Sequence, residues 1–164
     1  MTALDLSAFA PAHLSWADAL LRIGGAVLFS LVIGVERFVG RKPVDFRPFV
    51  IISLASCALA IGIVDLAYRT VDDTLSIDPA KVMSGVMSGI GFLGAGALFR
   101  EKHVVQGAGS AAAIWASGAI GLVCGLGSVW LGAVLGGVVL LLLLVGRGMT
   151  DRYDARITDD DDAD

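Results

Sequence analysis

The chain has 164 residues, of which 56% are hydrophobic and 17% are charged, and its formal net charge is −4 at pH 7. Ordinary globular proteins have about 25% charged residues, so the composition excludes an ordinary soluble domain. We expect the lipid bilayer as its surroundings and no nucleic-acid partner.

Long stretches without charge predict where the chain crosses a membrane. Between Val104 and Val145 there is no Asp, Glu, Lys or Arg. At ~1.5 Å per residue, this stretch can cross a bilayer core of ~30 Å twice. Because lipid offers no hydrogen bonds to the backbone, such spans should be helices. We therefore predict an all-α membrane helix bundle with five transmembrane helices, at about residues 17–36, 47–67, 81–99, 106–124 and 128–147.

The first predicted span has the uncharged core Ile23–Val35 and follows an extracytoplasmic N-terminal segment, residues 1–16. Arg22 lies near one end, where its long side chain can reach the headgroups. Glu36 and Arg37 close the span at the other end. Two interpretations of this pair stay open: an ion pair at the membrane interface, or a Glu36 carboxylate that faces the bundle interior and binds a cation.

A basic loop over residues 36–47 connects the first and second spans. Lys and Arg in short loops mark the cytoplasmic side of a membrane. No Lys or Arg precedes Arg22, so we expect the N-terminus outside and, after five crossings, the C-terminus in the cytoplasm. Most of the basic residues should be topology anchors, and a specific role for Lys42 or Arg47 is the alternative. The loop contains Arg37, Arg41, Lys42 and Arg47.

The third span begins at Asp78 and Pro79, which are typical of a helix N-cap and first turn. Capping alone explains Asp78, but Asp78 and Glu36 are also the candidate ligands for Mg²⁺, which prefers carboxylate oxygens. The segment "GIGFLG" (Gly89–Gly94) matches the dinucleotide-binding fingerprint. That fingerprint needs a strand before it and an acidic residue ~20 residues later. Neither is present, so we expect no dinucleotide.

Glycines in the third and fourth spans predict close helix packing. Gly85, Gly89 and Gly96 share one helix face because they are spaced by four and seven residues. Small residues let helix backbones approach each other closely in lipid. Contacts within one chain and contacts between copies of a homo-oligomer both fit this pattern. The expected helix-packing residues are Gly85, Gly89, Gly91, Gly94, Gly96, Gly118, Gly121 and Gly125.

The last two spans are followed by an acidic tail. Trp115 lies in the middle of the fourth span, where it would line a pocket or pack against a neighbouring helix. The transmembrane domain, residues 17–147, then gives way to residues 148–164, whose end is rich in Asp. This composition is typical of a solvated, disordered segment.

The sequence contains no recognisable catalytic motif. His13 and His103 are isolated and expected to be solvated, and Cys57 and Cys124 fall within predicted spans, where small apolar packing explains them. We find no nucleophile–base pair, metal-ligand cluster or phosphate loop in an accessible segment. The expectation is a protein that is not an enzyme and has no cofactor, with Mg²⁺ as the alternative.

Three blocks resemble the MgtC/SapB family of membrane proteins in order and spacing. They are "IGVERFVGRKPVDFRPFVIISLASCAL" (Ile33–Leu59), "DPAKVMSGVMSGIGFLGAGALF" (Asp78–Phe99) and "VQGAGSAAAIWASGAIGLVCGLG" (Val105–Gly127). The family pattern Arg-Thr-His is replaced by Arg47-Pro48-Phe49, and Thr-Thr is replaced by Gly109-Ser110. We expect a short form, without the soluble C-terminal domain of longer members.

The resemblance implies a bacterial inner-membrane protein linked to magnesium homeostasis, stress adaptation or virulence. Action through helix contacts, with itself or with a complex such as the proton-translocating ATP synthase, is the first hypothesis. Transport of Mg²⁺ or another small solute is the second. The residues that the resemblance carries over are Glu36, Arg37, Lys42, Arg47, Asp78, Ser88, Gly89–Gly96 and Trp115.

Overall fold

The computed structural model describes residues 10–40, 45–70, 78–101 and 104–161, and the side chains within them except at 99–101, 104–106 and 148–161. This part of the chain forms five helices and one two-stranded antiparallel hairpin. The prediction of an all-α helix bundle is therefore confirmed, with a short hairpin added. The elements are α1 (Trp16–Val39), α2 (Arg47–Arg69), α3 (Pro79–Gly96), β1 (Phe99–Glu101), β2 (Val104–Gln106), α4 (Ala108–Gly125) and α5 (Val129–Asp161).

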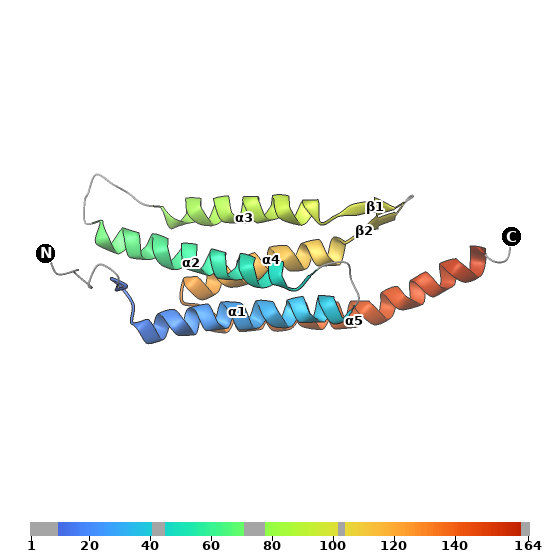
Figure 1. Ribbon diagram of the computed structural model, residues 1–164, viewed down its shortest axis with the longest axis horizontal. Helices are drawn as coiled ribbons and strands as arrows, with labels where there is room; N and C mark the ends of the chain where they lie inside the picture. The colour runs from blue at the N-terminus through green and yellow to red at the C-terminus, as the bar shows by residue number, and fades with distance from the viewer. Residues whose placement is uncertain (1–9, 41–44, 71–77, 102–103, 162–164) are drawn as a thin grey trace, which may run out of the picture.

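The five helices lie side by side and alternate in direction (Figure 1). Helix α4 is central and packs against each of the other four, whereas α3 packs mainly on α4 and to a lesser extent on α2. The start of α1 and the end of α5 therefore lie at opposite ends of the bundle, and α3 occupies its edge (Figure 1).

Local signals explain where the helices begin. The Ser15 hydroxyl accepts the N–H of Asp18 at 3.1 Å and caps α1. The Asp78 carboxylate accepts the N–H of Ala80 at 2.9 Å and caps α3. The capping expected for Asp78 is thus confirmed. Gly107 precedes α4 with φ of +89°, a left-handed conformation that side chains other than glycine rarely adopt.

The centre of the bundle is held by close backbone contact and by buried serines. A Cβ added to Gly121 would come within 2.9 Å of the Cα of Ser53, so α4 and α2 approach each other closely there. The hydroxyl of Ser53 donates to the carbonyl of Ala26 at 3.0 Å and links α2 to α1. Around these contacts lies an apolar core that includes Ile33, Phe49 and Ile120.

The five predicted spans each correspond to a helix, and four of these helices stand out by their length and apolar composition. Four helices in the described part of the chain are long and apolar enough to cross a membrane: α1, α2, α4 and residues 129–147 of α5. Helix α3 has less apolar character, because its 18 residues include several glycines, two serines, Pro79 and Lys81. Its crossing of the membrane stays a prediction. The chain is a multi-pass membrane protein, and the orientation of its termini stays a prediction.

Two features at the ends of helices add to the predicted spans. Between α3 and α4, β1 and β2 pair as an antiparallel hairpin with Arg100 opposite Val105. Helix α5 does not stop at residue 147 but runs to Asp161, so most of the segment expected to be disordered is helical. Charge alone does not end a helix in water, and residues 148–161 contain no proline.

Candidate functional site

The last turn of α1 carries a buried ion pair. Glu36 is 8% exposed and Arg37 is 6% exposed, and the guanidinium Nε of Arg37 donates to Glu36 Oε2. The structure has a feature of each interpretation from the sequence: Glu36 and Arg37 form an ion pair, and both side chains are buried in the bundle. Cation binding by this carboxylate stays a prediction.

Arg37 connects the end of α1 to two other helices. Its Nη2 lies 3.5 Å from the carbonyl oxygen of Leu143 in α5. Its Nη1 lies 3.6 Å from the position that a Cβ would take on Gly109, in the first turn of α4. A guanidinium next to the positive end of a helix is electrostatically unfavourable. The Glu36 carboxylate, the negative end of α1 in which Arg37 lies and the Leu143 carbonyl all compensate the charge of Arg37.

The second oxygen of Glu36 lacks a partner. Oε1 is buried and has no hydrogen bond with any described residue. A buried carboxylate oxygen in this state is costly, because the water that it loses on burial is not replaced. The oxygen lies near Gly40, the residue that ends α1.

The other polar candidates do not join this pair. Arg47 is exposed and forms an ion pair with Asp45 at 3.2 Å, as a topology anchor would. Asp78 is exposed at the start of α3, and in Figure 1 that start lies at the opposite end of the bundle from the last turn of α1. Lys42 lies outside the described residues. Glu36 and Asp78 are thus not brought together as ligands of one metal ion, and no group of three potential metal ligands occurs among the described residues.

The two remaining candidates, Ser88 and Trp115, lie on the outside of the bundle. Ser88 is exposed on α3. Trp115 is about half exposed on α4, so it does not lie in the core of the bundle. Neither residue contacts the Glu36–Arg37 pair through a hydrogen bond among the described residues. Their functional roles stay predictions.

The predicted packing glycines behave differently in α3 and α4. In α4, Gly118, Gly121 and Gly125 press against Ile90, Ser53 and Cys57, respectively. In α3, a Cβ on Gly94 would lie 3.3 Å from the carbonyl oxygen of Ala111. The other glycines of α3 have open space where a side chain would be, and no atom of the described chain lies within 4 Å of that position; they are Gly85, Gly89, Gly91 and Gly96.

Sequence reasoning missed a polar cluster at the opposite end of the bundle. Asp65 near the end of α2 accepts the N–H of Ala12 at 2.5 Å and the Nε of Arg69 at 2.7 Å. The Nδ1 of His13 lies 3.2 Å from Asp65, and its ring stacks on Tyr68 at 5.3 Å. The expectation that His13 is solvated was therefore wrong.

Only part of that cluster could have been found beforehand. Asp65 and Arg69 are four residues apart, a spacing that brings side chains together on a helix. His13, in contrast, is 52 residues from Asp65, and no local pattern connects the two. The cluster ties the segment before α1 to the end of α2.

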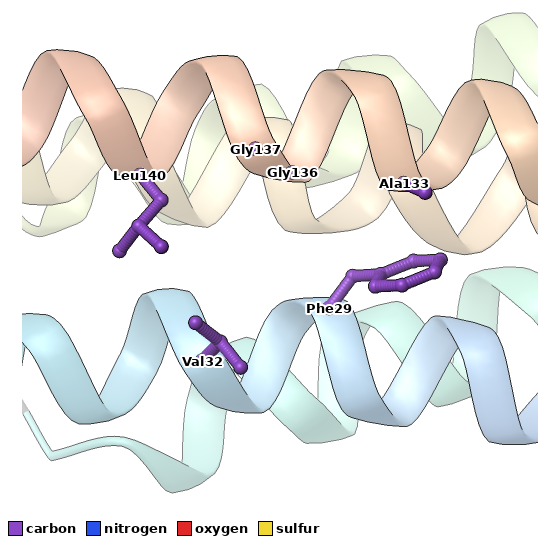
Figure 2. A pocket seen from close by; sticks show the side chains of 6 residues that line it. All are labelled: Phe29, Val32, Ala133, Gly136, Gly137 and Leu140. Carbon is purple, nitrogen blue, oxygen red and sulfur yellow. The ribbon is translucent and has the colours of Figure 1, made fainter.

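The cavities of the structure contain few polar groups. One, of about 170 Å³, lies between α1 and α5 and is lined by apolar side chains and glycines (Figure 2). In this view Phe29 and Val32 of α1 point towards α5, and Leu140 of α5 points towards α1 (Figure 2). A second cavity, of about 350 Å³, lies near Trp16, Asp65 and Arg69. Neither is lined by Glu36 or Arg37.

Comparison with known proteins gives a consistent family assignment. A model of the MgtC family matches residues 23–152. The chain is 35% identical to SapB of Bacillus subtilis over 119 residues, covering 70% of this chain and 51% of SapB. It is 33% identical to YhiD of Escherichia coli K12, named as a candidate magnesium transporter, over 78% of this chain and 60% of YhiD. It is 32% identical to MgtC of Salmonella typhimurium LT2, over 66% of this chain and 43% of MgtC.

These matches confirm the resemblance drawn from the sequence. The chain spans between about half and three fifths of the length of the first curated relatives that it matches. No solved structure matches it at a significant level.

Proposed function

The chain belongs to the MgtC family, and on that premise we propose that it is a non-enzymatic protein of the bacterial inner membrane that acts through contacts of α3 with another membrane helix. Its physiological setting is magnesium homeostasis, as the name of one relative, YhiD, suggests. The other helix belongs to a second copy of the chain or to another membrane protein complex.

The open glycine face of α3 carries this proposal. Glycine at a helix surface is useful in lipid where it allows a second backbone to approach. Helix α4 uses Gly118, Gly121 and Gly125 in this way within the chain. Gly85 and Gly89 of α3 have no atom of the described chain opposite them. At 100° per residue, Gly85, Gly89 and Gly96 point away from Ile90 and Gly94, which are the buried residues of α3.

Substitution of the open glycines by leucine tests the proposal. The double variant Gly85→Leu and Gly89→Leu fills the face of α3 without touching any contact of the folded chain. We expect loss of association, measured by counting labelled copies per particle in lipid nanodiscs and by photocrosslinking from α3 in native membranes. The magnesium link is tested by growth at limiting Mg²⁺ of a bacterial strain that carries the double variant in place of the wild type. This strain should grow as poorly as one from which the gene is deleted.

Matched controls are available on two other helices. Gly62 on α2 and Gly137 on α5 also have open space at the Cβ position, so their leucine variants control for added bulk in lipid. Both should keep the wild-type association. If the α3 double variant associates as the wild type does, both in nanodiscs and in native membranes, the proposal is wrong.

A second candidate function, transport of Mg²⁺ or another small solute, is supported by one observation. Glu36 is a buried carboxylate whose Oε1 has no hydrogen bond with a described residue, and ionisable groups at membrane depth often mark ion pathways. Flux into proteoliposomes that contain the wild type or Glu36→Gln tests it. Transport requires a flux that Glu36→Gln reduces, and the absence of any Mg²⁺ or solute flux removes this candidate.

A further inference from the structure

The cavity between α1 and α2, called here the α1–α2 cavity, combines apolar walls with a charged mouth. Its volume is about 350 Å³, within the range of ~300–1,000 Å³ that is usual for ligand pockets. Ile23 of α1 and Ile61 of α2 are among the apolar residues that line it. Asp65 and Arg69 line it near the end of α2, together with Ala10 of the segment before α1. The cavity therefore has the polarity that suits an amphipathic ligand.

Small residues leave this space open. Ala19 of α1 and Ala58 and Gly62 of α2 line the cavity, and a Cβ on Gly62 would meet no atom within 4 Å. Along α2 the lining runs from Ala58 to Arg69, a length of ~16 Å at ~1.5 Å per residue. This length is about half of the ~30 Å hydrocarbon core of a bilayer. The cavity thus matches the depth of one lipid leaflet.

The side chains at the mouth leave both donors and acceptors for a ligand. Arg69 is 42% exposed, and two of the five N–H groups of its guanidinium have partners among the described residues, Asp65 Oδ2 and the Ala10 carbonyl. The other N–H groups can donate to a phosphate, which guanidinium groups bind strongly. Asp65 Oδ2 and the Ala10 carbonyl oxygen each have one described donor, so each can accept a second hydrogen bond.

The charges at the mouth favour a ligand that carries both signs. Asp65 and Arg69 pair at 2.7 Å and together have no net charge. Helix α1 begins at Trp16, which lines the cavity, and α2 ends at Arg69. The positive end of one helix dipole and the negative end of another therefore lie at the mouth. A purely anionic headgroup would be repelled by Asp65 and by the end of α2.

We propose that the α1–α2 cavity binds one phospholipid whose zwitterionic headgroup has a primary ammonium group, as in phosphatidylethanolamine. One acyl chain lies between the two helices. The phosphate accepts from Arg69, and the ammonium group donates to Asp65 and to the Ala10 carbonyl.

This site is independent of the α3 surface. No residue of α3 lines the cavity. Loss of association in the α3 variants would leave the lipid proposal intact, and a failure of lipid binding would leave the helix-contact proposal intact.

Native mass spectrometry of the full chain in mild detergent tests the site. The chain is titrated with phosphatidylethanolamine, phosphatidylcholine and phosphatidylglycerol that have identical acyl chains. We expect one bound phosphatidylethanolamine per chain, with an affinity about tenfold higher than that of phosphatidylglycerol. Phosphatidylcholine, whose quaternary ammonium has no N–H group, should bind more weakly than phosphatidylethanolamine. Equal affinities for the three lipids, or tighter binding of phosphatidylglycerol, would overturn the proposal.

Two variants change the cavity by different means. Gly62→Leu fills it and should lose the bound lipid. Gly24→Leu is the matched control on α1, because its Cβ also meets no atom within 4 Å and Gly24 does not line the cavity; it should bind as the wild type does. Arg69→Gln removes the donor charge for the phosphate and should abolish the preference for phosphatidylethanolamine over phosphatidylglycerol.

The results that refute the site are distinct for each variant. The site is wrong if Gly62→Leu binds phosphatidylethanolamine as the wild type does, or if Gly24→Leu loses it as well. If Gly62→Leu does not fold, Arg69→Gln decides, and an unchanged preference in that variant refutes the site. A lipid-free dimer that Gly62→Leu dissociates would show that a second copy of the chain occupies the cavity, and the lipid proposal would then be wrong.

Discussion

The substitution of glycine by alanine should have different effects on the stability of the bundle in α4 and in α3. A Cβ on Gly121 would lie 2.8 Å from the carbonyl carbon of Ser53 and 2.9 Å from its Cα, and would come closer still to its carbonyl oxygen. These are backbone atoms of α2, which cannot rotate away, so the two helices must separate. Overpacking of a well-packed interior costs ~1–3 kcal/mol, and we expect Gly121→Ala to destabilise the bundle by at least this amount.

The same change at Gly89 provides the comparison. Its Cβ position is open, and alanine in a helix is favoured over glycine by ~0.5–1 kcal/mol, so Gly89→Ala should be neutral or slightly stabilising. Reversible unfolding in mixed micelles, followed by circular dichroism, measures both free energies. The reasoning is refuted if Gly121→Ala is as stable as the wild type, or if the two variants lose stability equally.

Three further outcomes follow from the polar contacts. Arg37→Leu should destabilise the fold by ~3–5 kcal/mol because it leaves the Glu36 charge buried and unpaired, whereas the double variant with Glu36→Leu should recover most of that loss in the same unfolding assay. Asp65→Asn should release the segment that contains His13, since hydrogen bonds to a charged group contribute ~1.5–3 kcal/mol each. Limited proteolysis of that segment should then be roughly tenfold faster or more. An unchanged rate would show that Asp65 does not hold the segment. Asp78→Ala should cost ~1 kcal/mol of helix stability, visible as faster hydrogen exchange in the first turn of α3.

Features that depend on neighbouring residues in the chain could be predicted well from the sequence. Uncharged runs located all five helices, because a helix in lipid must satisfy its own backbone. The start of α3 was predicted from Asp78 and Pro79, since a cap acts on the N–H groups directly after it. The length of α5 was not predicted, because its extension to Asp161 lies beyond the apolar run that was used to identify it.

Features that depend on which helices meet could not be predicted from the sequence. Glycines at similar spacing occur in α3 and α4, yet those of α4 touch α2 and α3, while most of those of α3 touch nothing in the described chain. The burial of Glu36 could not be decided for the same reason, since it depends on where α4 and α5 lie. His13 needed the fold to bring it to Asp65.

Helix α3 differs from the other helices in its polar contacts. Arg22 of α1 donates to the carbonyl of Gly125 at 2.9 Å and so holds the end of α4, and Arg37 reaches α5 near the other end of α1. Ser53 joins α2 to α1. Among the described side chains, no hydrogen bond or ion pair joins α3 to another helix. Among the described side chains, α3 therefore packs on the bundle without a polar contact to another helix, and a shift of α3 to meet another helix would break no such side-chain contact. A docking helix would need this freedom, and α3 has four open glycines: Gly85, Gly89, Gly91 and Gly96.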